Sequence, residues 1–141
     1  MDSKYIDKRP RFGWQLQHSF YFDGNQKRIA WRIESSSSKT EQRREHADIY
    51  LDKVTTVQSK LIALHVGIFW GIGRFIIKDN DEVKVMIEDK SLRDYLSKDK
   101  TSSDELISSR IYFINQLINQ RKLKIEYEII EPEKNYISKL I

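Results

Sequence analysis

The sequence contains no cysteine and no apolar stretch long enough to cross a membrane. The absence of cysteine excludes disulfides, thiolate catalysis and cysteine-based zinc or iron–sulfur sites, and it favours an intracellular, cytoplasmic protein. The longest apolar stretch, Leu61–Ile72, contains His65 and is shorter than a bilayer-spanning helix. Residues Met1–Gln17 carry scattered charges and lack the apolar segment of a secretory signal. We therefore expect a soluble protein with no membrane partner.

The charge balance is weakly positive. The 25 Lys and Arg residues outnumber the 21 Asp and Glu residues, which gives a formal net charge of +4. A positive balance suits a polyanionic partner such as nucleic acid, although many ordinary soluble proteins share it. A chain of 141 residues fits one domain, and a domain of that size buries roughly 70% of the surface of its unfolded chain.

Hydrophobic periodicity predicts an α/β protein. Alternating apolar residues predict five strands: Ser19–Phe22, Arg28–Glu34, Ala47–Val54, Glu82–Ile87 and Lys124–Ile130. Three- and four-residue periodicity predicts helices over Val57–Ile72, Ser91–Leu96 and Asp104–Arg121, and a short helical segment after Pro132. Turns join the first three strands, so we expect an antiparallel meander, with the Ser35–Ser38 run ending the second strand. We expect residues 1–17 to be a basic, aromatic arm and residues 18–141 to be the domain.

Local signals mark where several of these elements begin. Thr55 or Thr56 is the expected amino-terminal cap of the long helix, and Asp89 has the expected position of a cap for the short Ser91–Leu96 helix. Asp23 precedes Gly24, which is a common turn sequence. Gly67, Gly71 and Gly73 each weaken the long helix by up to about 1 kcal/mol, unless close packing against the sheet requires them.

Four of these segments, in this order, resemble the ribonuclease H family. Tyr21–Gly24 resembles the end of its first strand, and Thr55–Leu64 resembles its threonine-capped helix. Ile87–Leu92 is similar to its fourth strand and the following aspartate, and Ile130–Asn135 to its proline-containing last loop. The resemblance implies a mixed five-stranded sheet flanked by helices, with an antiparallel three-strand meander and the last two strands parallel to the first. It places the four metal-ligand positions of the family at Asp23, Lys60, Asp89 and Lys139.

Two of these four positions hold lysine where the family has a carboxylate. The family hydrolyses phosphodiesters with two magnesium ions, which need several carboxylates to bind side by side. A lysine ammonium has no lone pair for a metal, and the two replacements change the formal charge of the site from −4 to 0. We therefore expect no paired-metal site and no cofactor, with Asp23 and Asp89 instead forming ion pairs with Lys60 and Lys139.

Nearby carboxylates offer a route to residual catalysis with Mg²⁺ or Mn²⁺, in which Asp23 and Asp89 would be the metal ligands. Glu131 and Glu133 lie in the loop after the last strand. Glu88 precedes Asp89, and side-chain alternation places it on the opposite side of the sheet from Asp89.

Several basic and aromatic residues are candidates for nucleic-acid contact, although each alone reads as a solvated charge. The candidates are Lys27, Arg28, Arg43, Arg44, Lys90 and, for base stacking, Trp14. Trp31 and Trp70 are expected in the core. His18, His46 and His65 show neither metal-ligand spacing nor an evident serine or cysteine partner in the sequence, and His65 is expected to be packed or partly exposed.

Three functions follow from this pattern. The first is a catalytically impaired ribonuclease H-like protein that binds an RNA–DNA hybrid or double-stranded RNA without efficient cleavage. The second is an active endonuclease with an altered metal site. The third is a scaffold that binds a protein partner or forms a homodimer through the apolar helix face near Phe69, Trp70 and Phe75.

Overall fold

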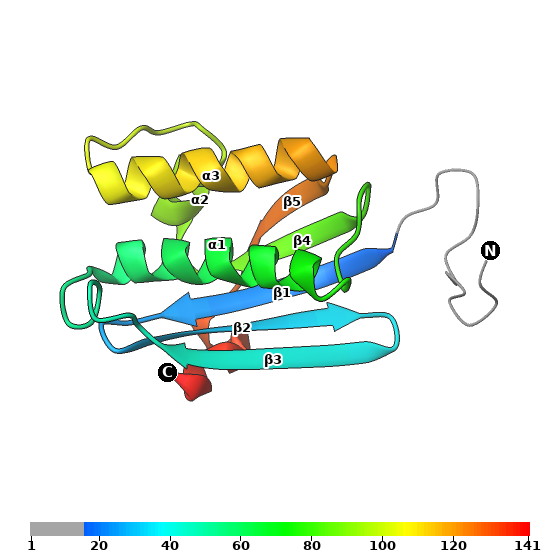
Figure 1. Cartoon of the computed structure of the whole chain (residues 1–141), viewed down its shortest axis with the longest axis horizontal. Helices are drawn as coiled ribbons and strands as arrows, with labels where there is room; N and C mark the ends of the chain where they lie inside the picture. Colours follow the sequence, from blue (N-terminus) through cyan, green and yellow to red (C-terminus); the bar gives the residue numbers. More distant parts are fainter. Residues whose placement is uncertain (1–15) are drawn as a thin grey trace.

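Five strands form one mixed sheet in the computed structural model, which describes residues 16–141 (Figure 1). Their order across the sheet is β3-β2-β1-β4-β5. The pairs β1–β2 and β2–β3 are antiparallel, whereas β1–β4 and β4–β5 are parallel. This topology confirms the sheet expected from the sequence. The strand bounds are β1 (Gln17–Gly24), β2 (Arg28–Ser35), β3 (Ser38–Glu45), β4 (Glu82–Ile87) and β5 (Lys124–Ile129).

The third strand lies earlier in the chain than its predicted position. It spans Ser38–Glu45, and the predicted strand Ala47–Val54 is wrong because that segment forms turns. The strand β3 is the sheet edge, and all its side chains are exposed or half-buried, so it needs no apolar residues. Ser35 and Ser38 are strand residues that pair across a two-residue turn, so the serine run is part of a hairpin. The sequence also places Gln17 in the arm, whereas the structure places it in β1.

The helices begin where the local signals predict. Thr55 caps the first helix: its Oγ1 accepts from the Gln58 backbone N–H at 3.1 Å, and the Gln58 side chain accepts from the Thr55 N–H at 2.9 Å. Asp89 and Asp104 cap the next two helices. The helices are α1 (Thr56–Gly73), α2 (Lys90–Leu96) and α3 (Glu105–Arg121), followed by the short 3₁₀ helices η1 (Pro132–Lys134) and η2 (Tyr136–Leu140).

Helices α1 and α3 pack side by side on one face of the sheet, and η2 contacts β1 and β2 (Figure 1). The core lies between the sheet and α1, where Phe20, Trp31 and Leu64 are completely buried. Trp70 is half-buried against this core, as the sequence predicts. Within residues 16–141, no helix combines the length and the hydropathy needed to cross a membrane.

Glycine lets α1 approach the sheet closely. A Cβ atom added at Gly67 would lie 2.5 Å from Phe20 Cζ and 2.9 Å from Trp31 Cγ. One added at Gly71 would lie 2.8 Å from Ile33 Cδ1. A Cβ at Gly73 would meet nothing within 4 Å. Close packing therefore explains Gly67 and Gly71, and it does not explain Gly73.

Replacing Gly67 by alanine is expected to lower the free energy of unfolding by roughly 1–3 kcal/mol, because buried aromatic rings must move to admit the methyl group. Gly73→Ala is the matched control on the same helix. It should leave stability unchanged or raise it by up to about 1 kcal/mol, because alanine favours a helix. Urea denaturation of both variants measures the difference. Equal stabilities would contradict the close approach of α1 to the sheet.

Candidate acidic site at the ends of β1 and β4

The parallel pairing of β1 and β4 brings two carboxylates to the same edge of the sheet. Tyr21 pairs with Met86 in the register of these strands. Two residues further along each strand, Asp23 is therefore opposite Glu88, and strand alternation places both on the same face as Tyr21 and Met86. Asp23 is buried and Glu88 is half-buried. These two acids form the base of the candidate site.

The carboxy-terminal segment closes this pair of acids with hydrogen-bond donors. Ser138 Oγ donates to Asp23 Oδ2 at 2.5 Å and lies 3.3 Å from Glu88 Oε2. Asn135 Nδ2 donates to Glu88 Oε2 at 2.6 Å and to the Phe22 carbonyl at 3.0 Å. The other oxygen of Asp23, Oδ1, accepts from the Gly24 N–H at 2.8 Å. Protein donors thus already occupy three of the four carboxylate oxygens.

Lys60 supplies the positive charge of the cluster, as the sequence predicts. Its Nζ lies 3.8 Å from Asp23 Oδ1, and the two side chains are only 16% and 9% exposed. Helix α1 reaches this position because Gly24 packs directly on Ser59, where a Cβ would lie 2.9 Å from the Ser59 backbone. We call Asp23, Lys60, Glu88 and Ser138 the acidic-edge cluster. Its formal charge is −1, from two carboxylates and one ammonium.

Two predicted site residues lie outside this cluster. Asp89 Oδ1 accepts from the Ser91 N–H at 2.8 Å and so caps α2, in agreement with its other expected role. Lys139 is exposed, and no ion pair joins it to Asp89 in the part of the chain that the structure describes. The expected Asp89–Lys139 ion pair is therefore wrong. Their chain neighbours Glu88 and Ser138 join Asp23 instead, through the contacts of Ser138 with both carboxylates.

Three exposed basic residues are neighbours of the cluster in the sheet register or along the chain. Asp23 pairs with Ala30, which pairs with Arg43, so Arg43 lies two strands from Asp23 on the same sheet face. Lys90 begins α2 directly after Asp89, and Lys139 follows Ser138. No ion pair within residues 16–141 involves Arg43, Lys90 or Lys139, which leaves their charges available to a ligand.

The other predicted contact residues are less available. Lys27 forms an ion pair with Asp52 at 2.7 Å, and Arg28 lies 3.5 Å from Glu45. Arg44 is on the opposite sheet face from Arg43, with its guanidinium 5.1 Å from the centre of the Trp31 ring. Trp14 lies outside the described residues.

His65 is a neutral packing residue. Arg110 Nη1 donates to His65 Nδ1 at 2.8 Å, and the Phe113 ring stacks on the imidazole at 6.0 Å between centroids. Burial, with a smaller contribution from the Arg110 charge, lowers the pKa of His65 to about 4. The ring is therefore uncharged near neutral pH, in agreement with its interpretation as a packed side chain.

The structure resembles known ribonuclease H domains. The amino-terminal RNase H domain of a Mycobacterium tuberculosis protein superposes with a TM-score of 0.72 at 14% identity, covering 88% of this chain and 95% of that one. RNase H1 of Halobacterium salinarum gives 0.65 at 10% identity, covering 89% and 93%. The RNase H1 named LC11, in complex with an RNA/DNA hybrid, gives 0.67 at 14% identity, covering 89% and 93%.

Sequence comparison adds nothing to this likeness, since neither a protein-family model nor a curated protein matches the chain. At these low identities the structural likeness shows the fold alone. Together with the strand order, it shows that the chain has the ribonuclease H-like fold.

Proposed function

We propose that this protein binds nucleic acid, an RNA–DNA hybrid or double-stranded RNA, without cleaving it efficiently. The ribonuclease H-like fold supports the binding half of the proposal, because the structural neighbour LC11 RNase H1 is in complex with an RNA/DNA hybrid. The single observation that carries the other half is the Lys60 ammonium 3.8 Å from Asp23. It stands where the fold family implies a metal ligand.

The residues of the acidic-edge cluster do not fit a pair of magnesium ions. Two such ions carry a charge of +4 and need carboxylates that bridge and neutralise them. The cluster has a net charge of only −1, and its lysine repels a dication. Moreover, hydrogen bonds from Gly24, Asn135 and Ser138 already hold its carboxylates. Within residues 16–141, no three His, Asp or Glu side chains are grouped to hold a metal ion.

The basic residues around the cluster match the chemistry of a phosphate backbone. Arg43, Lys90 and Lys139 would contact phosphates, whose recognition depends on charge and groove shape more than on base sequence. Binding of this kind releases counterions, so its affinity falls steeply as the salt concentration rises. This surface is the proposed interface.

A labelled hybrid tests both halves of the proposal. We expect fluorescence anisotropy to show that the protein binds the hybrid at 50 mM salt and that the affinity falls steeply by 200 mM salt. Competition with unlabelled double-stranded RNA and with DNA then shows which nucleic acid the protein prefers. Incubation with Mg²⁺ or Mn²⁺ should leave the hybrid intact on a gel. Cleavage that disappears in Asp23→Asn would refute the loss of activity and favour a nuclease with an altered metal site. No binding at low salt would refute the nucleic-acid partner.

A scaffold function remains the second candidate because large apolar side chains are exposed on the helical side. Phe69 is 62% exposed and Phe75 74%, while Tyr112 and Phe113 of α3 are 63% and 45% exposed. Of these, Tyr112 and Phe113 contact each other, and exposed aromatic residues are enriched in protein interfaces. Sedimentation velocity decides between the two candidate functions. The scaffold would be favoured if the protein forms a dimer, if Phe69→Ser and Phe113→Ser dissociate that dimer, and if the protein binds no nucleic acid.

A further inference from the structure

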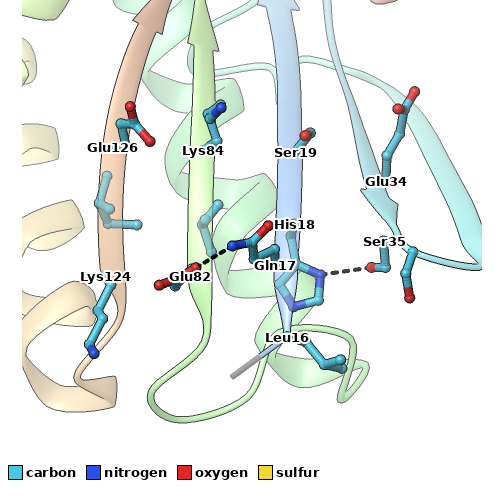
Figure 2. A pocket seen from close by; sticks show the side chains of 13 residues that line it. Leu16, Gln17, His18, Ser19, Glu34, Ser35, Glu82, Lys84, Lys124 and Glu126 are labelled. Carbon is cyan, nitrogen blue, oxygen red and sulfur yellow. Dashed lines mark hydrogen bonds between the residues drawn. The ribbon is translucent and has the colours of Figure 1, made fainter. Parts of the chain in front are cut away.

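A polar groove lies at the opposite end of the sheet from the acidic-edge cluster. It has a volume of about 700 Å³ and crosses the amino-terminal ends of β1, β4 and β5 and the carboxyl end of β2 (Figure 2). Gln17, Glu34, Lys84 and Lys124 line it, together with His18 and Ser35. Charged groups of both signs around an open groove suit a small polar ligand.

A serine, a histidine and an aspartate are hydrogen-bonded in sequence beside this groove, where the side chains of His18 and Asp81 are buried and Ser35 is half-buried. Ser35 Oγ lies 2.7 Å from His18 Nδ1, the contact drawn in Figure 2, and His18 Nε2 lies 2.9 Å from Asp81 Oδ2. The sheet register explains the first contact. Ser19 pairs with Glu34, so one residue back on β1 and one forward on β2, His18 is opposite Ser35. Sequence alone showed no serine partner for His18, because this register was unknown.

The proton positions follow from the chemistry of these groups. Asp81 is completely buried and also accepts from the Lys78 N–H at 2.9 Å. A carboxylate can only accept, so His18 Nε2 carries the ring proton and donates it to Asp81. When the imidazole is neutral, His18 Nδ1 carries the lone pair that accepts from the Ser35 hydroxyl. A histidine held in this way can act as a general base on a serine, with its two ring nitrogens exchanged relative to the Ser-His-Asp triad of serine proteases.

A second histidine–serine pair in the protein shows that such contacts need not be reactive. His46 Nε2 lies 2.8 Å from Ser59 Oγ, but this hydroxyl donates to the Asn25 carbonyl and Ser59 is completely buried. Within residues 16–141, no carboxylate contacts His46. Ser35 differs on each count: it is only half-buried, it lines a groove, and its histidine has a carboxylate partner.

We propose that Ser35 is the nucleophile of an acyl-transfer site that hydrolyses small polar carboxylic esters. Ser35 Oγ attacks the carbonyl carbon while its proton passes to His18 Nδ1. The same proton then protonates the departing alcohol as the ester C–O bond breaks, which leaves an acyl-serine. A water molecule then attacks the acyl carbon while His18 Nδ1 takes its proton. The bond between that carbon and Ser35 Oγ breaks, the proton passes from His18 to Oγ, and the carboxylic acid leaves. Asp81 is a positioning residue that fixes the tautomer and orientation of His18.

The turn after Ser35 offers a donor for the negative oxygen of the tetrahedral intermediate. The backbone N–H of Ser36 makes no hydrogen bond to another residue of 16–141. The residue after a nucleophilic serine supplies such an N–H in known serine hydrolases. This site is independent of the proposed nucleic-acid function, because it uses none of the cluster residues and lies at the other end of the sheet.

The four consecutive serines Ser35–Ser38 provide a matched experiment. The full chain is treated with diisopropyl fluorophosphate and, separately, with p-nitrophenyl acetate. We expect one phosphoryl adduct per chain, mapped to Ser35 by mass spectrometry, and a burst of nearly one equivalent of p-nitrophenolate. Ser35→Ala should abolish both signals, whereas Ser37→Ala and Ser38→Ala should keep them. No adduct, or equal labelling of the serines, would overturn the proposal.

The proposed role of Asp81 is tested by measurements that would not change if Asp81 only stabilised the fold. Nitrogen-15 NMR of the wild-type imidazole should show the proton of His18 on Nε2, and a proton on Nδ1 would overturn the proposal. Asp81→Asn should slow acylation of Ser35 by roughly 10³–10⁴-fold while a cooperative melting transition remains. An unchanged acylation rate would remove Asp81 from the site. If the variant unfolds, the serine comparison and the wild-type tautomer still decide the proposal.

Discussion

Replacing Lys60 by glutamate and Ser138 by aspartate is expected to create a magnesium site in the acidic-edge cluster. The two changes remove the ammonium next to Asp23 and the hydroxyl that bridges Asp23 and Glu88. The formal charge goes from −1 to −4, since four carboxylates then face one another. Their mutual repulsion should lower stability without metal, and a dication that relieves it should bind tightly.

Calorimetry and thermal melting measure this gain. The wild type should show no binding heat and no change of melting temperature up to low millimolar Mg²⁺. The double variant should bind Mg²⁺, and at ten times the dissociation constant the ion should stabilise it by about 1.4 kcal/mol. Magnesium-dependent cleavage of an RNA–DNA hybrid would be a further gain, and adding Asp23→Asn should abolish it.

The matched control is Lys60→Glu combined with Lys139→Asp, the pair that the family resemblance indicated from sequence. Lys139 is exposed and outside the cluster, so this control adds the same number of carboxylates without placing one beside Glu88. It should bind Mg²⁺ much more weakly. Magnesium binding by the wild type, or tighter binding by the control than by the Ser138 variant, would contradict the assignment of the cluster.

The two double variants differ in using Ser138 or Lys139, and this difference shows which residues of the site could be predicted from the sequence. The ion pair between Asp23 and Lys60 is predicted correctly because local signals fix both residues: an Asp-Gly turn ends the strand, and a threonine capping box begins the helix. Glu88 and Ser138 were missed by one residue each. Which of two adjacent acids faces Asp23 depends on the β1–β4 register, which is set by tertiary packing.

The edge strand β3 was missed for a related reason. Its sequence, Ser38–Glu45, contains no apolar residue, so it has no hydrophobic alternation to detect. Backbone pairing with β2 and the exposed position at the sheet edge account for it instead. The false strand at Ala47–Val54 shows that alternation of apolar and polar residues also occurs in turns. The predicted order of strands and helices was nevertheless correct, and this order was enough to indicate the fold.

Neutralising the basic residues beside the cluster is expected to cause the largest loss of nucleic-acid affinity. In the triple variant Arg43→Ala, Lys90→Ala, Lys139→Ala, three phosphate contacts should disappear. Each contact contributes about 0.9 to the slope of log affinity against log salt, so the slope should become shallower by roughly 2.7. At 0.1 M salt the affinity for hybrid should fall by roughly two to three orders of magnitude, whatever the base sequence.

A control with the same charge change tests whether position matters. Lys39, Lys84 and Lys124 lie toward the opposite end of the sheet, near the turn between β2 and β3 and the starts of β4 and β5. Their replacement by alanine also removes three positive charges, so net charge alone would weaken binding equally in both variants. If the nucleic acid binds beside the acidic-edge cluster, only the variant that replaces Arg43, Lys90 and Lys139 should lose much of its affinity. Equal salt slopes for the two triple variants, measured by anisotropy titration, would show that the nucleic acid does not bind there.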